Sequence, residues 1–175
     1  MSAAAIAKLQ SRTEAVDSML CVGLDSAFEK IPETFRHHDR PQFAFNRWII
    51  DQTHPHVVAY KPNLAFYEAR GAEGWADLAE TMAYLRATEP RILTIADGKR
   101  ADIDSTNAGY VAGIIDELGF DAITLHPYLG REALRPFLDR EEVACIVLCR
   151  TSNAGAGELQ DLEVDGVPLW EVVAR

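Results

Sequence analysis

Five short apolar runs recur along the chain, each bounded by charged or turn-forming residues. They stand at positions 21–25, 57–61, 91–97, 122–126 and 143–150. Each run is too short and too continuous for a surface helix, whose apolar residues recur only every three or four positions. Continuous runs of this length are typical of strands that are buried on both faces of a parallel sheet. The pattern therefore predicts five parallel strands.

Between these runs, apolar residues recur at intervals of three and four, which places them on one face of a helix. The four segments are marked by Phe45, Trp48 and Ile49, by Trp75, Leu78, Met82 and Leu85, by Val111, Ile114, Ile115 and Leu118, and by Leu134 and Phe137. Pro90 is placed to end the second helix and Gly119 to end the third. The alternation of strands and helices predicts an α/β fold with right-handed crossovers.

Each predicted strand ends in a polar or charged residue. These residues are Asp25, Lys61, Asp97, His126 and Arg150. The carboxyl ends of the strands in a (β/α)8 barrel form one ring around the active site, whereas a doubly wound open sheet binds ligands only near its switch point. Five polar strand ends therefore favour an α/β fold of the (β/α)8 TIM-barrel type. Such a barrel needs eight units and the pattern supplies about five, so we expect residues 1–175 to form a single barrel domain that is incomplete at its C-terminus.

The longest stretch without a periodic pattern covers residues 151–168. It follows the fifth strand directly, so we interpret it as an irregular active-site loop rather than as a linker between two domains. Pro168 closes this stretch and suits the first position of a helix over "LWEVV".

Composition narrows the class of protein. The 175 residues are 48% hydrophobic, which is enough to bury a core, and carry a formal net charge of −10. The 17 Lys and Arg are dispersed, whereas nonspecific binding of nucleic acid needs a clustered basic face. No apolar run reaches the length of about 18 residues that a membrane span requires, and charges interrupt the N-terminus where a signal peptide is apolar. We expect a cytoplasmic protein with no membrane and no nucleic acid as partners.

The three cysteines, Cys21, Cys145 and Cys149, all lie within the predicted strands. An odd number of thiols in apolar runs fits small core residues in a reducing compartment better than it fits disulfides. At about 3.3 Å per residue, Cys145 and Cys149 would lie about 13 Å apart on one strand, too far for a disulfide. We therefore expect three buried, free thiols.

The run "DGKRADI" at 97–103 places several charges directly after a buried strand. Asp97 and Lys99 are two positions apart on an extended segment, so we expect their side chains on the same side of the strand end. Asp102 stands where the next helix begins, and Asp102, Asp104 or Ser105 could cap that helix. Capping does not explain Asp97 or Lys99, whose charges are costly at the end of an apolar strand unless they are paired or used. The alternatives for these two are a structural ion pair and a catalytic pair.

The residue types disfavour a metal or cofactor site. Lys61 and Lys99 alternate with the carboxylates and supply the positive charge that a cation would otherwise bring. The histidines at 37, 38, 54 and 56 lie in loops or at helix ends, where solvated imidazoles are commoner than metal ligands. The glycines of "NAGAG" match neither a P-loop nor a dinucleotide-binding fingerprint. We expect no metal and no nicotinamide, flavin or nucleotide cofactor.

Four motifs together resemble one known family. In chain order they are "GLD" at 23–25, "YKPN" at 60–63, "DGKRADI" at 97–103 and "LCRTSN" at 148–153. Over essentially the whole chain, this set resembles the orotidine 5′-monophosphate decarboxylases of the longer bacterial subclass. The pattern Asp-x-Lys-x-x-Asp is shared with related barrel decarboxylases and aldolases that act on sugar phosphates. The lysine of "YKPN" and the serine of "RTSN" make the resemblance to the orotidine 5′-monophosphate decarboxylases more specific.

The resemblance implies a cofactor-independent carbon–carbon lyase that converts orotidine 5′-monophosphate to UMP, the last step of de novo pyrimidine biosynthesis. It implies that Lys99 protonates C6 after carbon dioxide has left, and that Asp97 lies against the substrate's carboxylate. Lys61 resembles the second lysine of the family's charged array. Asp102 resembles the fourth member, which reaches across a dimer interface into the partner's site, so a homodimer is implied.

The resemblance also implies four contacts around the substrate. Asp25 corresponds to a ligand of the ribose hydroxyls and Ser152 to the contact with the pyrimidine amide, while Ile103 and Thr106 stand beside Asp102. One position departs from the family pattern, because a proline is expected after "TSN" and Ala154 stands there. This departure concerns the rigidity of the loop and not the charged residues.

Two other functions stay open at this point. A sister sugar-phosphate decarboxylase or hexulose-phosphate synthase of the same barrel group typically has a carboxylate where this chain has Lys61, and needs magnesium. Lys61 therefore argues against that function. The second is a non-catalytic chain, because the last strands of the barrel, which hold the substrate phosphate in the family, are missing from the pattern.

Overall fold

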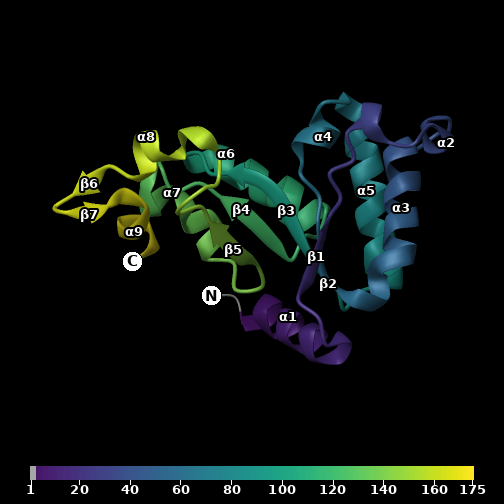
Figure 1. Ribbon diagram of the computed structural model, residues 1–175, viewed down its shortest axis with the longest axis horizontal. Coiled ribbons are helices and arrows are strands. Elements are labelled where there is room, and N and C mark those ends of the chain that lie inside the picture. Colours follow the sequence, from purple (N-terminus) through teal and green to yellow (C-terminus); the bar gives the residue numbers. More distant parts are fainter. Residues whose placement is uncertain (1–2) are drawn as a thin grey trace.

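Five parallel strands form the central sheet of the computed structural model, which describes residues 3–175. They are β1 (Leu20–Gly23), β2 (Val57–Lys61), β3 (Leu93–Arg100), β4 (Ala122–Leu125) and β5 (Ala144–Val147). Strands that follow each other in the chain are neighbours in the sheet, in the order β1-β2-β3-β4-β5 (Figure 1). The five strands confirm the prediction, and their bounds fall within three residues of the predicted ones.

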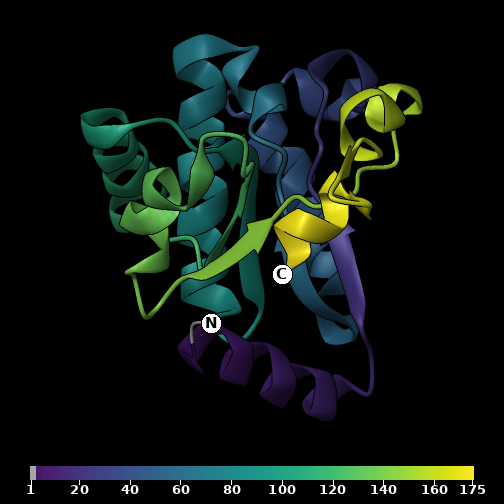
Figure 2. The ribbon, with the colours of Figure 1, turned by 90° about the vertical axis from the view of Figure 1, so that its left-hand side faces the viewer.

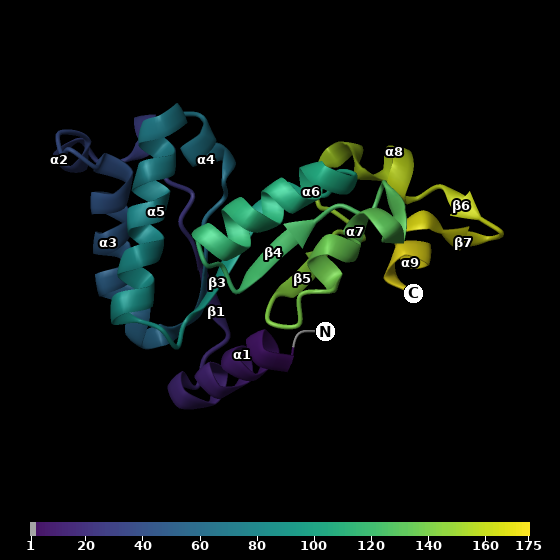
Figure 3. The ribbon, with the colours of Figure 1, turned by 180° about the vertical axis from the view of Figure 1, so that it is seen from behind.

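Helices between the strands cover one face of the sheet, which we call the outer face (Figure 3). The predicted helices are α3 (Pro41–Thr53), α5 (Gly71–Thr88), α6 (Asp104–Tyr110) with its π-helical continuation η3 (Val111–Glu117), and α7 (Gly130–Leu138). Shorter elements are η1 (Phe28–Lys30), α2 (Glu33–Arg36), η2 (His54–His56) and α4 (Ala65–Glu68). Their apolar sides bury strand residues such as Tyr60 and Ile123 completely. No helix among residues 3–175 is long and apolar enough to cross a membrane.

A further helix, α1 (Ala3–Val16), lies across the amino ends of the strands (Figure 2). It packs there against residues of the opposite, inner face of the sheet. Its apolar side joins a cluster with small and branched residues of β2, β3 and β4. Arg12 donates to the carbonyl of Val57 at 3.0 Å, and Lys8 pairs with Asp121 at 2.8 Å. Two cations thus fix the helix to the starts of β2 and β4. The apolar pattern along the chain did not predict this helix.

Residues 151–168 contain more regular structure than the predicted irregular loop. The elements are η4 (Ala154–Ala156), α8 (Gly157–Gln160), β6 (Glu163–Val164) and β7 (Val167–Pro168), followed by α9 (Leu169–Ala174). Asp165 and Gly166 form the turn between β6 and β7, with φ of 53° and 78°, and this hairpin points away from the main sheet (Figure 1). The prediction was wrong because strands of two residues are too short to show a periodic pattern. The final helix is confirmed, with Pro168 as its N-cap rather than its first residue.

The cysteines correct another prediction. Cys21 is exposed, and Cys145 and Cys149 are only partly buried, although all three are free thiols as predicted. Cys21 and Cys145 lie on β1 and β5, the two edge strands of the sheet. An edge strand has a neighbour on one side only, so its side chains keep more of their exposure. Cys149 lies beyond the last residue of β5, Val147.

The two edges of the sheet expose apolar side chains. Leu20 on β1 is 50% exposed, and Ile146 on β5 is 41% exposed. A cavity of about 800 Å³ lies beside β5, lined by residues that include Ile6 of α1 and Val143. Unpaired strand edges with apolar side chains are templates for association with another chain.

We expect the isolated 175-residue chain to self-associate through these edges. Ile146→Lys should lower the associated fraction, because it places a charge on the exposed edge of β5. Analytical ultracentrifugation at several concentrations measures this. Leu159→Lys is the matched control, because Leu159 is 46% exposed but lies on α8, outside the sheet. Equal effects of the two substitutions would contradict association through the edge.

Candidate active site

Polar side chains occupy the carboxyl end of the inner face. The residues of β2, β3 and β4 that pack beneath α1 include Ala59, Ile95 and Ala122. Lys61, Asp97 and Thr124 follow two positions further along the same strands. Because side chains alternate between the faces of a sheet, these three share the inner face. The inner face therefore changes from apolar under α1 to charged and polar at the strand ends.

Asp97 is the centre of a charged array, which we define as Lys61, Asp97 and Lys99. Lys61 Nζ lies 2.8 Å from Oδ2 of Asp97, and Lys99 Nζ lies 2.6 Å from Oδ1. The Asp97 side chain is 10% exposed, against 32% for Lys61 and 48% for Lys99. The carboxylate is thus covered while both ammonium groups still reach solvent. The array joins three of the four residues that the resemblance implied as catalytic.

The array keeps Asp97 ionised. Burial by itself raises the pKa of Asp97, but hydrogen bonds from Lys61 and Lys99 and the charge of Lys61 outweigh it and lower the pKa to about 2. Burial by itself lowers the pKa of Lys61, but the hydrogen bond to Asp97 and the charges of Asp97 and Asp25 raise it. A carboxylate and an ammonium group in direct contact stabilise each other's charged form.

Lys99 reaches Asp97 by a different backbone path from the predicted one. The register between β3 and β4 shifts between Ala96 and Arg100, and Lys99 has a φ of 47°. The segment is therefore a bulge with a left-handed residue, and the prediction of an extended segment was wrong here. A bulge re-aims the side chains that follow it, and here it still directs the ammonium group of Lys99 at Asp97.

Thr124 is a residue that sequence reasoning missed. Its Oγ1 lies 3.0 Å from Oδ1 of Asp97 and accepts the backbone N–H of Lys99 at 2.9 Å. The residue is buried, with 7% exposure. The available signal was a hydroxyl within the otherwise apolar run "AITL" of β4, two positions before His126.

Asp25 lies at the same end of the sheet, just after β1. Its Oδ1 accepts the backbone N–H of Asn63 at 3.1 Å, and Asn63 forms a parallel β-bridge with Asp97. Asp25 is exposed, and its charge contributes to the raised pKa of Lys61. The sheet thus brings Asp25 within electrostatic reach of the array.

A buried polar network holds the residues on both sides of Asp25. The hydroxyl of Tyr67 donates to the carbonyl of Leu24 at 2.7 Å, and Nε2 of Gln42 donates to the carbonyl of Ser26 at 2.8 Å. The network continues through Asn46, Thr81, Asp77 and Arg70 on α3, α5 and the segment between α4 and α5. Helices of the outer layer thus position a loop at the carboxyl end of the sheet.

Asp102 does not join the array of its own chain. Its carboxylate accepts the backbone N–H of Ile103 at 2.7 Å and makes no ion pair with Lys61 or Lys99. Ile103 is 56% exposed, and Thr106 is exposed beside it at the start of α6. Asp102 itself is partly buried, so only Ile103 and Thr106 are exposed, and none of the three joins the array of its own chain.

The start of α6 corrects the predicted cap. The N-cap is Ile103 and has no side-chain cap hydrogen bond, so none of Asp102, Asp104 and Ser105 is the N-cap of the helix. The buried side chain of Asn107 holds this loop instead. Its Oδ1 accepts the backbone N–H of Asp102 at 2.7 Å, and its Nδ2 donates to the carbonyl of Ala133 at 2.6 Å.

Ser152 is exposed on a loop that its neighbours hold in place. The N–H of Thr151 donates to Oε1 of Gln160 at 2.8 Å, and Arg150 pairs with Asp161 at 2.9 Å. Within residues 3–175, the side chain of Ser152 has no hydrogen-bond partner. Arg150 therefore anchors the loop after β5 and does not contact the charged array. The prediction that the polar residues at all five strand ends meet around one site does not hold for Arg150.

His126, at the end of β4, also stays outside the array. Its backbone N–H donates to the carbonyl of Arg100 at 3.1 Å, which continues the pairing of β4 with the end of β3. Of the five polar strand ends, the structure therefore gathers Asp25, Lys61 and Asp97.

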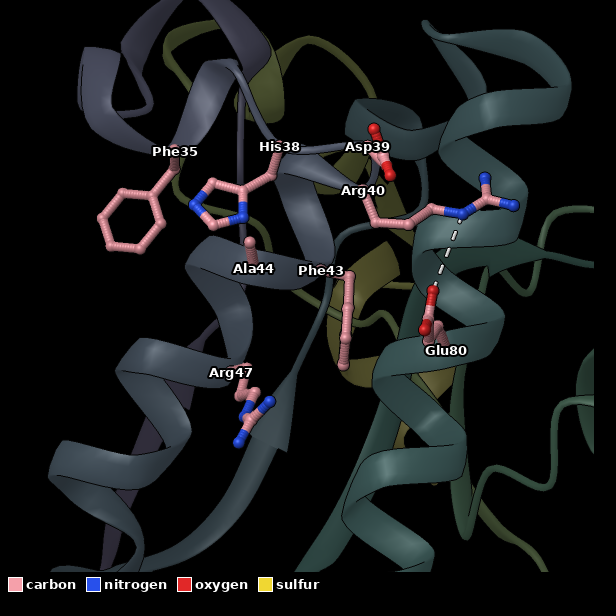
Figure 4. A pocket seen from close by; sticks show the side chains of 8 residues that line it. All are labelled: Phe35, His38, Asp39, Arg40, Phe43, Ala44, Arg47 and Glu80. Atoms are coloured by element: carbon pink, nitrogen blue, oxygen red, sulfur yellow. Dashed lines mark ion pairs between the residues drawn. The ribbon is translucent and has the colours of Figure 1, made fainter.

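A separate pocket of about 350 Å³ lies on the outer layer, between the start of α3 and α5 (Figure 4). Phe35, Phe43 and two arginines line it. Arg40 reaches Glu80 at 3.6 Å, as the dashed line shows, while Arg47 lies further along α3. No residue of the charged array lines this pocket, so it belongs to the helix packing and not to the candidate site.

Comparison with known families supplies the decisive observation. The model of the Orotidine 5'-phosphate decarboxylase / HUMPS family matches residues 18–174, which include the whole array and all five strands. The chain belongs to this family. The orotidine 5'-phosphate decarboxylase of Halorubrum lacusprofundi is 52% identical over 167 residues, which are 95% of this chain and 58% of the relative. That of Cellvibrio japonicus is 46% identical over 171 residues, 97% of this chain and 62% of the relative. The chain thus spans about 60% of the length of these relatives.

Solved structures of the family have the same architecture. Leishmania donovani OMP decarboxylase matches with a TM-score of 0.85 and 38% identity, covering 98% of this chain and 63% of that chain. Leishmania donovani UMP synthase matches with a TM-score of 0.83 and 39% identity, covering 95% of this chain and 34% of that chain. The strand–helix units of this family member therefore have the TIM-barrel type of α/β fold, which confirms the prediction from the polar strand ends.

Ionised Asp97 should stabilise the fold above about pH 4. Its pKa of about 2 in the folded chain lies below the value of about 3.9 for an unfolded Asp, so the contribution is complete above the unfolded pKa and is lost as the pH falls through the folded one. Urea unfolding between about pH 6 and pH 2 measures this for wild type and Asp97→Asn. The free-energy difference between the two should shrink as the pH falls, because Asn cannot titrate. A difference that stays constant over this range would contradict the lowered pKa.

Proposed function

We propose that this chain carries the reacting centre of a cofactor-independent orotidine 5′-monophosphate decarboxylase, which forms UMP in pyrimidine biosynthesis. The observation that supports the proposal most is the charged array, with one covered carboxylate between two ammonium groups at the carboxyl ends of β2 and β3. Membership of the family and the names of its relatives support the same reaction.

The reaction needs the kind of charge that Lys99 supplies. Loss of carbon dioxide from C6 breaks the carbon–carbon bond and leaves its electron pair in the plane of the pyrimidine ring, where the ring cannot delocalise it. Without a cofactor as electron sink, fixed charges of the protein must stabilise the carbanion. The ammonium group of Lys99, held 2.6 Å from Asp97, offers a fixed positive charge and the proton that C6 finally takes.

Asp97 and Lys61 prepare the site for this step. With its pKa lowered to about 2, Asp97 is ionised at neutral pH and lies against the substrate's carboxylate, where like charges favour departure of carbon dioxide. Lys61 balances the charge of Asp97 before the substrate binds, and its contact at 2.8 Å fixes the orientation of the carboxylate.

The remaining residues hold the substrate. In this proposal Asp25 binds the ribose hydroxyls, because its carboxylate is exposed beside the array and its loop is held by the buried network. Ser152 binds the pyrimidine amide with a hydroxyl that has no other partner within residues 3–175. Ala154 begins the short helix η4 of this loop, and the bonds of Thr151 to Gln160 supply rigidity in place of the proline usual there.

We propose further that two copies form a homodimer in which Asp102, Ile103 and Thr106 complete the partner's site. The exposure of Ile103 and Thr106, and the carboxylate of Asp102 that forms no ion pair with Lys61 or Lys99, support this geometry. Tyr128 and Leu129, in the loop after β4, are 77% and 45% exposed. Apolar side chains exposed at the same end of the sheet suit a contact with a second copy.

Two alternatives carry less support. A sister enzyme that acts on sugar phosphates would hold magnesium with carboxylates, and the ammonium group of Lys61 occupies the position next to Asp97 where such a carboxylate would stand. A non-catalytic role rests on the length of the chain relative to its relatives, of which it spans about 60%.

Decarboxylation should depend on Lys99. In a chain extended by the C-terminal part of a relative, the fall in absorbance of orotidine 5′-monophosphate measures kcat directly. Lys99→Ala should lower kcat by at least about a hundredfold, because a positioned acid contributes roughly that much or more, while circular dichroism stays unchanged because Lys99 is half exposed. Retention of more than about a tenth of the wild-type kcat would rule out the proton-donor role.

Metal removal separates the two enzymatic functions. Because Lys61 and Lys99 supply the positive charge, EDTA should leave kcat of the same extended chain unchanged. A loss of activity that magnesium restores would instead favour the sister enzyme.

A further inference from the structure

The bulge in β3 leaves one backbone group without its ladder partner. In a regular strand the N–H of Lys99 would point to the same side as that of Asp97, which donates to the carbonyl of Pro62 at 3.1 Å. The register with β4 shifts between Ala96 and Arg100, and the N–H of Lys99 turns toward β4 instead. A partly buried N–H without a partner is costly, so another acceptor stabilises this backbone. That acceptor is Oγ1 of Thr124, 2.9 Å from the nitrogen.

The same hydroxyl also holds the carboxylate of the array. Oγ1 of Thr124 lies 3.0 Å from Oδ1 of Asp97 and 3.5 Å from the carbonyl of Ala96. A hydroxyl has a single proton, and the nearer, charged acceptor is the stronger one. The hydroxyl of Thr124 therefore donates its proton to Asp97, while its oxygen accepts the backbone N–H of Lys99.

The backbone of Lys99 needs such support. Its φ of 47° lies in the left-handed region, which is unfavourable for a residue with a β-carbon and persists only where the surroundings enforce it. The hydrogen bond from its N–H to Thr124 is one restraint, and the bond from His126 N–H to the carbonyl of Arg100 is the next along the chain.

We propose that Thr124 is a positioning residue, whose hydroxyl sets the distance between Lys99 and Asp97 by binding both. The inference rests on the proposed function for its effect on catalysis, but its geometric part stands apart from it. Thr124 touches no reacting atom and acts through the two residues that do. It also links β4, which contributes no charged residue to the array, to the reacting centre on β3.

Two substitutions isolate the hydroxyl. Thr124→Val keeps the shape and removes both hydrogen bonds, whereas Thr124→Ser keeps the hydroxyl. Thr94→Val is a matched control, because Thr94 is also a buried strand threonine that donates to a carboxylate, Asp121 at 2.8 Å, and accepts a backbone N–H, at 3.2 Å. Thr94 lies at the opposite end of β3, away from the array.

Hydrogen exchange of this 175-residue chain tests the geometry without any assay of activity. In Thr124→Val, fragments that contain residues 97–101 should exchange at least about fivefold faster than in wild type, because the N–H of Lys99 has lost its acceptor. Thr124→Ser and Thr94→Val should leave these fragments near the wild-type rate. Unchanged exchange in Thr124→Val, or equal acceleration in Thr94→Val, would overturn the proposal.

Kinetics of the extended chain test the consequence. Thr124→Val should lower kcat by roughly tenfold to a hundredfold with little change in KM, since a small misplacement of the reacting groups affects the chemical step. Thr124→Ser should restore most of kcat. A kcat of Thr124→Val within twofold of an active wild type would overturn the proposal. If wild type itself shows no decarboxylation, the proposed function fails, and the exchange result alone decides the role of Thr124.

Discussion

The covered carboxylate of Asp97 is the constraint on which the carboxyl end of the sheet depends. A charge removed from water is costly unless cations and hydrogen bonds compensate it, and removal of one partner leaves an uncompensated charge. Asp97 is compensated from three strands, by Lys61 of β2, Lys99 of β3 and Thr124 of β4. One side chain thus couples the alignment of three strands to the positions of both ammonium groups.

The alternation of side chains connects this array to the core. On the inner face, the small side chains of Ala59 and Ala122 let α1 pack closely against the sheet. Two positions further along the same strands, the inner face carries Lys61 and Thr124, beyond the apolar residues that contact α1. The burial that stabilises the sheet therefore also covers Asp97 and strengthens its interactions with the lysines, because exclusion of water weakens screening.

The outer layer contributes at a distance. Tyr67 and Gln42 belong to α4 and α3, yet their side chains hold the carbonyls on either side of Asp25. Asn107 on α6 does the same for the loop that carries Asp102, and binds the carbonyl of Ala133 on α7 as well. Buried polar groups are costly unless every partner is present, so these contacts specify loop positions that apolar packing alone leaves variable.

Local patterns were sufficient to predict the strands, the helices between them and the candidate residues Asp25, Lys61, Asp97 and Lys99. The reason is that a strand buried on both faces, and a polar residue at its end, can be recognised from consecutive positions of the chain. They were insufficient wherever partners lie far apart in the chain. The bulge at Lys99 depends on Thr124, 25 residues away, and the loop at Asp102 on Asn107 and α7 rather than on a helix cap. The exposure of Cys21 follows from the place of β1 at a sheet edge, which no local pattern contains. Pairing between distant strands decides these features, because a residue's burial and hydrogen-bond partners come from neighbours in space rather than in sequence.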